Sequence, residues 1–185
     1  MTFANKVSIF RIISIPFFLA SVLYYGPGRD FLRYVALGVF FLAAVSDFID
    51  GYIARVKKQK TKFGSIIDPL ADKLLLTTSF VCLYVQGDIY PGMRLPLGVV
   101  LVVISRDVII LIGAMIIYIM RQDLNVQPSY WGKFTTFSQM LTVIMLLLRI
   151  NTVHIVWGVA VFFTVLSGMD YLRKGVLLLS AIDTR

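Results

Sequence analysis

Apolar residues in this chain form six long runs, each separated from the next by a short polar break. The runs cover residues 7–25, 32–53, 65–86, 95–119, 134–150 and 153–177. A helix that crosses a bilayer needs about 20 mostly apolar residues, so each run is close to the required length. The breaks carry glycine, proline and asparagine, which favour turns. The pattern therefore predicts a bundle of six transmembrane helices joined by short turns.

Composition supports this interpretation. The chain has 185 residues, of which 58% are hydrophobic and 15% charged, whereas soluble domains are about 45–50% apolar and about 25% charged. One small core cannot hide this excess, and disorder requires low hydrophobicity. No gap between the runs could hold a separate soluble domain. We therefore expect an all-α integral membrane protein in which residues 1–185 form a single domain.

The charges give an orientation. The chain has 18 Lys and Arg against 10 acidic residues, a net charge of +8. With the N-terminus in the cytoplasm, 12 basic residues flank the cytoplasmic ends of the runs and 4 flank the opposite ends. Cytoplasmic loops of membrane proteins carry such an excess, so both termini are predicted to be cytoplasmic. The same placement explains the basic pI, because basic residues at the helix ends orient the protein and bind anionic lipid. A nucleic-acid partner is not needed to explain the charge.

Candidate chemistry is concentrated in the acidic residues, because Cys82 and His154 are the only residues of their types and cannot form a metal cluster. All ten acids are aspartates. Four of them, Asp47, Asp50, Asp68 and Asp72, fall at the predicted cytoplasmic ends of the second and third runs. Acids at such depth are costly and are candidates for function.

The spacing of these aspartates predicts a shared cleft. Asp47 and Asp50 are three residues apart, and Asp68 and Asp72 are four apart, so each pair lies on one stripe of a helix. The short turn between the two helices makes them antiparallel neighbours, which allows the four carboxylates to converge. Small residues lie on the same stripes and leave room beside the acids: Gly51, Ala54, Gly64 and Ala71.

A ligand set made only of oxygen suits a hard cation such as Mg²⁺ or Mn²⁺. Four carboxylates can hold two such ions, an arrangement that stabilises both the attacking and the leaving oxygen in phosphoryl transfer. Two alternatives remain open at this point. The aspartates could form a structural network with lysine, or a proton or cation relay in a transporter. The small residues favour a site with space for a phosphorylated substrate.

The same residues resemble a known family signature. Asp47-Phe-Ile-Asp50-Gly51-Tyr-Ile-Ala54-Arg55, eight residues, and then Gly64-Ser-Ile-Ile-Asp68-Pro-Leu-Ala-Asp72 are similar to D-x-x-D-G-x-x-A-R-x8-G-x-x-x-D-x-x-x-D of the CDP-alcohol phosphotransferases. Members pass the phosphatidyl group of a CDP-linked lipid to an alcohol and release CMP. The chain length and six predicted helices also fit this family.

The resemblance implies roles for individual residues. Asp47, Asp50, Asp68 and Asp72 would hold two divalent cations, and Asp72 would also be the general base for the acceptor hydroxyl. The CDP-lipid would be bound by Gly51, Ala54, Arg55, Thr61 and Gly64. The family often forms dimers, so a homodimer is expected. The chain size, and the phosphatidylglycerophosphate synthase branch of the family described next, suggest the inner (cytoplasmic) membrane of a bacterium. The active site is expected to face the cytoplasm.

The acceptor alcohol depends on other residues. Arg106-Asp107 interrupts the apolar run at 95–119, and arginine there must be paired or face a polar cavity. It could simply pair with an aspartate, or it could join Lys133 as an anion site for a phosphorylated alcohol.

Three stretches resemble phosphatidylglycerophosphate synthases, which use glycerol 3-phosphate: residues 5–11, 132–139 and 167–175. Thr135 and Asp107 depart from that branch, where Lys and Glu are common. Other acceptors, such as inositol phosphate, serine or a lipid alcohol, stay open.

Overall fold

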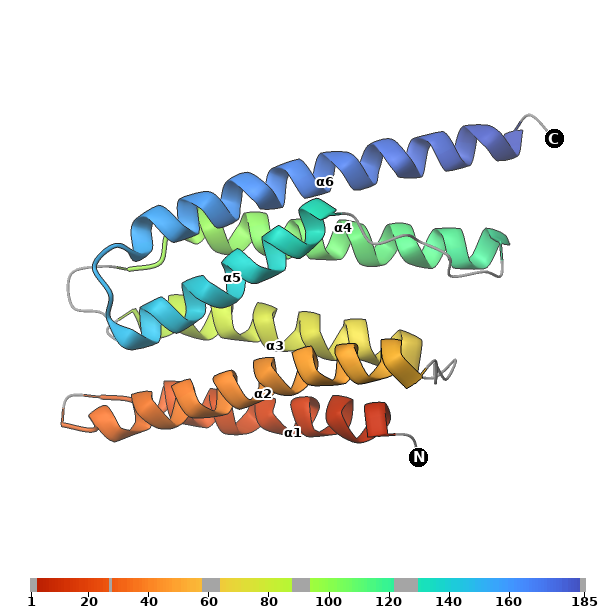
Figure 1. The fold of residues 1–185 in the computed structure, drawn as a ribbon. Helices are drawn as coiled ribbons and strands as arrows, with labels where there is room; N and C mark the ends of the chain where they lie inside the picture. Colours follow the sequence, from red (N-terminus) through yellow and green to blue (C-terminus); the bar gives the residue numbers. More distant parts are fainter. Residues whose placement is uncertain (1–2, 27, 58–63, 88–93, 122–129, 184–185) are drawn as a thin grey trace. The chain divides into compact units, whose positions relative to one another are not determined.

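The computed structural model describes residues 3–26, 28–57, 64–87, 94–121 and 130–183. Within these ranges it gives the backbone alone for residues 3–6, 8, 47–57, 64–70, 72, 114, 116–121 and 174–183. The described residues form six α-helices and no strand (Figure 1). The helices are α1 (Phe3–Leu23), α2 (Asp30–Lys57), α3 (Gly64–Gln86), α4 (Leu97–Arg121), α5 (Tyr130–Leu148) and α6 (Val153–Asp183).

The all-helical prediction is confirmed, and each apolar run coincides with one helix. Several helices extend beyond their apolar runs: α2 continues to Lys57, α5 begins at Tyr130 and α6 continues to Asp183. In α2 the added residues include Ala54, Arg55 and Lys57, which have good helix propensity and prolong the helix beyond its apolar part. Asp30 occupies the first turn of α2, where a carboxylate interacts favourably with the positive end of the helix dipole.

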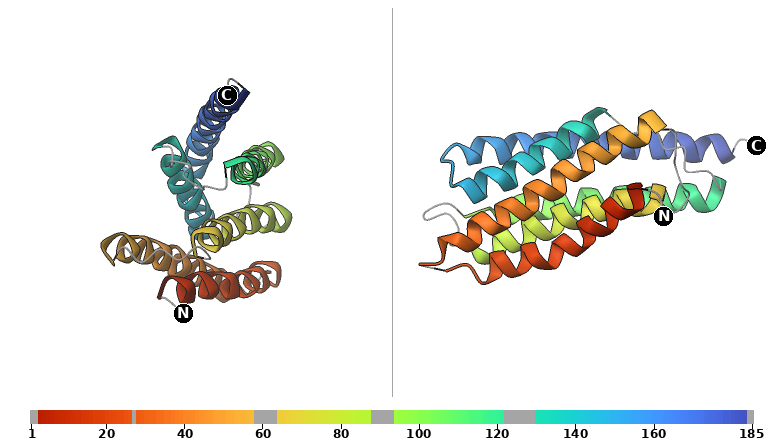
Figure 2. Two further views of the ribbon diagram at one scale, coloured as in Figure 1. Left: turned by 90° about the vertical axis from the view of Figure 1, so that its right-hand side faces the viewer. Right: turned by 60° about the horizontal axis from the view of Figure 1, so that its bottom comes forward.

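The described residues divide into two compact units. Unit 1 contains residues 1–96 and 143–151, and therefore α1, α2, α3 and the end of α5. Within it α1 packs against both α2 and α3, an arrangement visible in the three views of Figures 1 and 2. Phe18 of α1 meets Phe40 of α2 with ring centroids 5.9 Å apart. Leu75, Leu76 and Phe80 of α3 are also fully buried.

A group of polar contacts closes one end of unit 1. The turn after α1 contains Gly28 at φ +86°, a left-handed conformation that favours glycine. Just beyond it, Arg33 is buried and donates to the backbone carbonyl of Leu147 at 2.7 Å. Arg149, also left-handed at φ 57°, pairs with Asp30 at 3.2 Å and donates to the Tyr25 hydroxyl. These contacts connect the α1–α2 turn to the C-terminal end of α5.

Unit 2 contains residues 97–142 and 152–185, and therefore α4, α6 and the first part of α5. Here α4 packs against α6. Unlike the largely apolar core of unit 1, the interior of unit 2 includes many polar side chains. The fully or nearly fully buried ones are Arg106, Asp107, Thr135, Ser138, Gln139, Thr142, Thr164 and Ser167.

The outer faces of the helices are strongly apolar. Along α6, Ile155, Phe162, Met169 and Leu172 are each more than half exposed, an arrangement that soluble monomers avoid. Two helices are long and apolar enough to cross a membrane, Tyr130–Leu148 and Val153–Arg173. Ile9–Leu23 and Lys73–Gln86 are shorter apolar helical segments. The prediction that all six helices span the membrane therefore goes further than these two candidates.

Candidate functional site

The four predicted metal-binding aspartates lie on two helices of unit 1. Asp47 and Asp50 are in the C-terminal half of α2, and Asp68 and Asp72 are in the first turns of α3. Figure 1 shows these parts of α2 and α3 toward the same end of unit 1 as the N-terminal part of α1.

The continuous helical backbone of α2 and α3 supports the predicted stripes, because residues three and four apart share a helix face. The side chains of the four aspartates lie outside the described residues, as do those of Ala54 and Arg55, and Gly51 and Gly64 are described by their backbone alone. Thr61 falls in the undescribed segment 58–63. The metal set and the CDP-lipid contacts therefore remain predictions. Among the side chains that are described, no three His, Cys or acidic residues gather as an alternative metal site.

Arg11 is a feature of this region that apolar patterning does not single out. The charge pattern predicts a cytoplasmic flanking cation here, yet the side chain is only 1% exposed. Phe18 and Phe40 are in contact, and α1 and α2 run in opposite directions (Figure 1). Arg11 precedes Phe18 by seven residues and Asp47 follows Phe40 by seven, so both positions lie toward the same end of unit 1. A buried cation thus lies in the part of unit 1 that carries the aspartates.

Arg106 of α4 is the centre of a second polar cluster, in unit 2. Its side chain is 6% exposed. Nη1 donates to the Asp107 carboxylate at 2.7 Å, and Nη2 donates to the Ser167 hydroxyl on α6 at 2.6 Å. The guanidinium also lies 5.8 Å from the centre of the Tyr171 ring. Arginine is therefore tolerated in this apolar helix because it is paired within the protein.

Two of the stretches singled out in the sequence meet at this guanidinium. Gly132 of α5 is so close that a Cβ atom there would lie 3.4 Å from Nη2 of Arg106 and 3.7 Å from the Ser167 hydroxyl. Gly168 of α6 approaches the aliphatic part of Arg106, with a Cβ distance of 3.7 Å to Cγ. Both segments are distant from Arg106 in sequence, and each approaches its side chain closely at a glycine.

Lys133 lies next to Gly132 but is exposed. Its ammonium group is 5.4 Å from the centre of the Tyr130 ring, and the described contacts of Arg106 do not include it. The two predicted acceptor-site cations are thus a buried Arg106 close to Gly132 and an exposed Lys133 next to it in sequence. The alternative prediction, a local ion pair of Arg106 with Asp107, is present at the distance given above.

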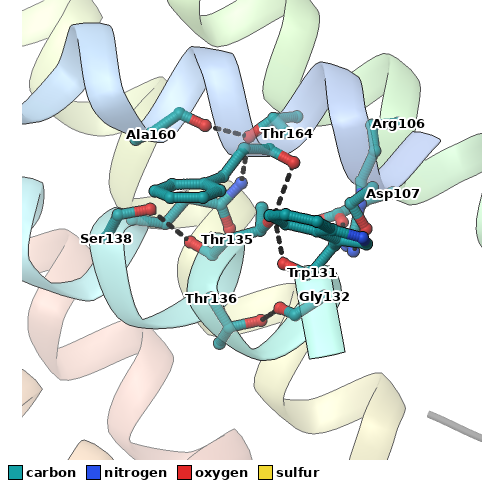
Figure 3. Close-up of polar contacts among 12 residues, drawn as sticks. Arg106, Asp107, Trp131, Gly132, Thr135, Thr136, Ser138, Ala160 and Thr164 are labelled. Atoms are coloured by element: carbon teal, nitrogen blue, oxygen red, sulfur yellow. Dashed lines mark hydrogen bonds and ion pairs between the residues drawn. The ribbon is translucent and has the colours of Figure 1, made fainter. Parts of the chain in front are cut away.

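A row of hydroxyl and amide groups extends from this cluster along α5 and α6 (Figure 3). The Thr135 hydroxyl lies 2.9 Å from the carbonyl oxygens of both Trp131 and Phe163, so it can connect α5 to α6. Gln139 donates to the Thr164 hydroxyl at 3.3 Å, which itself donates to the Ala160 carbonyl at 2.6 Å. Thr135 departs from the phosphatidylglycerophosphate synthase pattern, in which lysine is common at this position. In this chain its hydroxyl group can link α5 to α6.

Comparison with known proteins finds relatives that match most of the chain. A family model described as CDP-alcohol phosphatidyltransferase matches residues 1–166. The CDP-diacylglycerol–glycerol-3-phosphate 3-phosphatidyltransferase of Haemophilus influenzae is 34% identical over 179 residues, covering 93% of each chain. Proteins of the same name from Bacillus subtilis and Escherichia coli are 34% and 32% identical. The first covers 92% of this chain and 93% of its own, and the second 90% of both.

Proposed function

Because the chain belongs to the CDP-alcohol phosphatidyltransferase family, we propose that it transfers the phosphatidyl group of CDP-diacylglycerol to glycerol 3-phosphate. The products are phosphatidylglycerophosphate and CMP. The observation that carries this proposal is the similarity along nearly the whole chain to three transferases named for these two substrates. The complete aspartate signature in α2 and α3 supports the same chemistry.

The reaction is a single displacement at phosphorus. The acceptor hydroxyl oxygen attacks the phosphorus of the phosphatidyl group and forms a new P–O bond. The P–O bond to CMP breaks, and CMP leaves with its electron pair. An alcohol is a weak nucleophile at neutral pH, so a base must take its proton. We assign this proton to the carboxylate of Asp72.

The donor set of the aspartate site fits divalent cations, because every predicted ligand is a carboxylate oxygen. Asp47, Asp50, Asp68 and Asp72 would hold two ions, Mg²⁺ or Mn²⁺. Bound ions supply neutralisation of the diphosphate and of the charge that develops on CMP. With that charge balanced, no covalent enzyme intermediate is needed.

The CDP-lipid would bind over the same helical stripes. Gly51 and Ala54 would leave space for the cytidine, next to the helix face that carries the acids. Arg55 offers a planar set of donors suited to phosphate oxygens. Thr61 would add a hydroxyl donor to the CDP-lipid site. Gly64, which has no side chain, would leave space in it.

We assign the acceptor phosphate to Arg106 and Lys133. The support is the buried guanidinium at the meeting point of α4, α5 and α6 in unit 2, and the exposed lysine beside Gly132. Binding of that remote phosphate would orient the hydroxyl for attack. Serine or choline, which carry no phosphate, would lack this contact.

For the whole molecule we propose six membrane-spanning helices with both termini and the active site on the cytoplasmic side of the inner membrane. The 12-to-4 distribution of flanking basic residues supports this orientation. Residues 1–185 would act as one domain, since a single family match includes parts of both units. A homodimer is the proposed assembly, with the exposed apolar helix faces available for packing between copies or against lipid.

CMP release tests this function. Purified protein with Mg²⁺ should release CMP from CDP-diacylglycerol only when glycerol 3-phosphate is present. Asp72→Asn should lower kcat by about a hundredfold or more, the contribution of a general base. Asp123→Asn, outside the signature, is the matched control and should keep full activity. Absence of CMP release from the wild-type protein with any alcohol would overturn the proposal.

A further inference from the structure

We propose that the Ser167 hydroxyl is a phosphate-binding group of the acceptor site, which it forms together with Arg106 and with the space left by Gly132. This inference rests on the proposed function and extends it to a residue for which the signature gives no role. The proposed anion site is formed by residues of α4, α5 and α6, all in unit 2.

The hydrogen bonding of Ser167 differs from that of the other buried hydroxyl groups. Along the described helices, Ser14, Ser21, Ser79, Ser138, Thr142 and Thr164 each donate to a carbonyl of their own helix, at 2.6–2.9 Å. Ser167 is 0% exposed, and its described hydrogen bond is the one that it accepts from Arg106. Phe163, four residues before Ser167, accepts a bond from Thr135 instead. The Ser167 proton is therefore still available to an incoming acceptor.

Arg106 has donors to spare at the same place. A guanidinium has five N–H groups, and the described contacts use one on Nη1 and one on Nη2. Its Nε is buried and lacks a hydrogen-bond partner among the described residues. Leaving a buried donor unpaired is costly. A phosphate oxygen next to Nη2 would accept from both Arg106 and Ser167, and charged hydrogen bonds of this kind are the stronger ones.

Gly132 supplies the space for such an oxygen. A methyl group at this position would touch Nη2 of Arg106 and the Ser167 hydroxyl, at 3.4 and 3.7 Å, which are ordinary contact distances. Gly132→Ala is therefore compatible with folding, yet it fills the volume beside the two donors. Gly132 is also partly exposed and adjoins the exposed Lys133, so an anion would approach the cluster from this side.

The test is steady-state kinetics on the full-length protein in detergent micelles. Ser167→Ala should raise the KM for glycerol 3-phosphate by about tenfold or more, as expected for a lost hydrogen bond to a charged group. The KM for CDP-diacylglycerol should stay the same. Ser167→Thr, which keeps the hydroxyl, should restore most of the affinity. Gly132→Ala should also raise the KM for glycerol 3-phosphate.

Gly168→Ala is the matched control, because its methyl group would meet only the Cγ atom of Arg106 and should leave this KM unchanged. Ser138→Ala removes a buried hydroxyl that bonds only to its own helix and serves the same purpose. As a readout without turnover, glycerol 3-phosphate should raise the Tm of the wild-type protein by mass action. This rise should be smaller for Ser167→Ala and Gly132→Ala.

The outcomes separate the two proposals. An active wild-type enzyme whose glycerol 3-phosphate KM and Tm rise are unaffected by Ser167→Ala overturns the role of Ser167 alone. Equal increases in KM for Gly132→Ala and Gly168→Ala would assign the effect to packing and would overturn the site as described. A wild-type protein that transfers nothing to glycerol 3-phosphate contradicts the proposed function itself.

Discussion

Arg106 illustrates what individual residues reveal in sequence and in structure. A charged residue inside an apolar run already indicates that it must be paired or functional. Asp107, its sequence neighbour, is a possible partner by position, and the ion pair is present. The contacts of Arg106 with Ser167 and Gly132 could not be predicted, because they depend on how α4, α5 and α6 pack. The burial of Arg11 escapes prediction for the same reason.

Asp107 should stabilise the folded protein through its ion pair with Arg106. Asp107→Leu should lower the free energy of unfolding by about 3 kcal/mol or more, since it leaves the buried guanidinium without its counter-charge. Asp107→Asn keeps an oxygen acceptor and should cost less. Both can be measured as thermal denaturation of the purified protein in one detergent.

The double variant Arg106→Met/Asp107→Leu provides the control for Asp107. It removes both charges, and buried pairs can often be replaced by apolar residues without loss of stability. Its Tm should therefore be higher than that of Asp107→Leu alone. If the single and double variants were equally destabilised, the ion pair would not be the reason for the loss.

At the scale of the elements, the polar contacts at the end of unit 1 hold a turn in place. The pattern of apolar runs correctly predicts a break between the first two helices, and Gly26-Pro27-Gly28 marks it as a turn. The pattern does not reveal that Arg33 reaches a carbonyl at the C-terminal end of α5, 114 residues away. It predicts flanking arginines only as charges at the membrane surface. A buried carbonyl without a donor is unfavourable, so this contact has a stabilising role.

Arg33→Leu should therefore destabilise unit 1. The substitution leaves the Leu147 carbonyl without the Arg33 donor, and the expected loss in free energy of unfolding is about 1–3 kcal/mol. Arg29→Leu removes an exposed arginine from the same turn and is the matched control, expected to change the Tm little. Circular dichroism melting of the two variants makes the comparison. Equal Tm values for both would show that the Arg33 contact contributes nothing.

At the scale of the whole molecule, patterning predicts the helical class and the number of helices in the described residues, because apolar length is a local property of the sequence. The fixed spacing of Asp47, Asp50, Asp68 and Asp72 indicates the family. Two properties are not local. The first is the hydrogen bonding between α5 and α6, such as the bond from Gln139 to Thr164. The second is the burial of Arg106 and Ser167. Both depend on how the helices pack.

The proposed topology makes a prediction for the intact membrane. Cys82 is buried, and it is the only cysteine in the chain, so Cys82→Ala provides a background for introduced cysteines. In intact bacterial spheroplasts, a membrane-impermeant maleimide should label Arg29→Cys and should leave Arg185→Cys unlabelled. After the membrane is permeabilised, both should react. Labelling of Arg185→Cys in sealed spheroplasts would contradict a cytoplasmic C-terminus.

The most direct test of the central claim is the mass of the lipid product. Purified protein, CDP-diacylglycerol and Mg²⁺ are incubated with glycerol 3-phosphate, inositol phosphate, inositol or serine in separate reactions. Mass spectrometry should find phosphatidylglycerophosphate from glycerol 3-phosphate, with one CMP for each lipid formed, and little product from the other alcohols. A lipid formed from serine or inositol, with glycerol 3-phosphate left unreacted, would contradict the account.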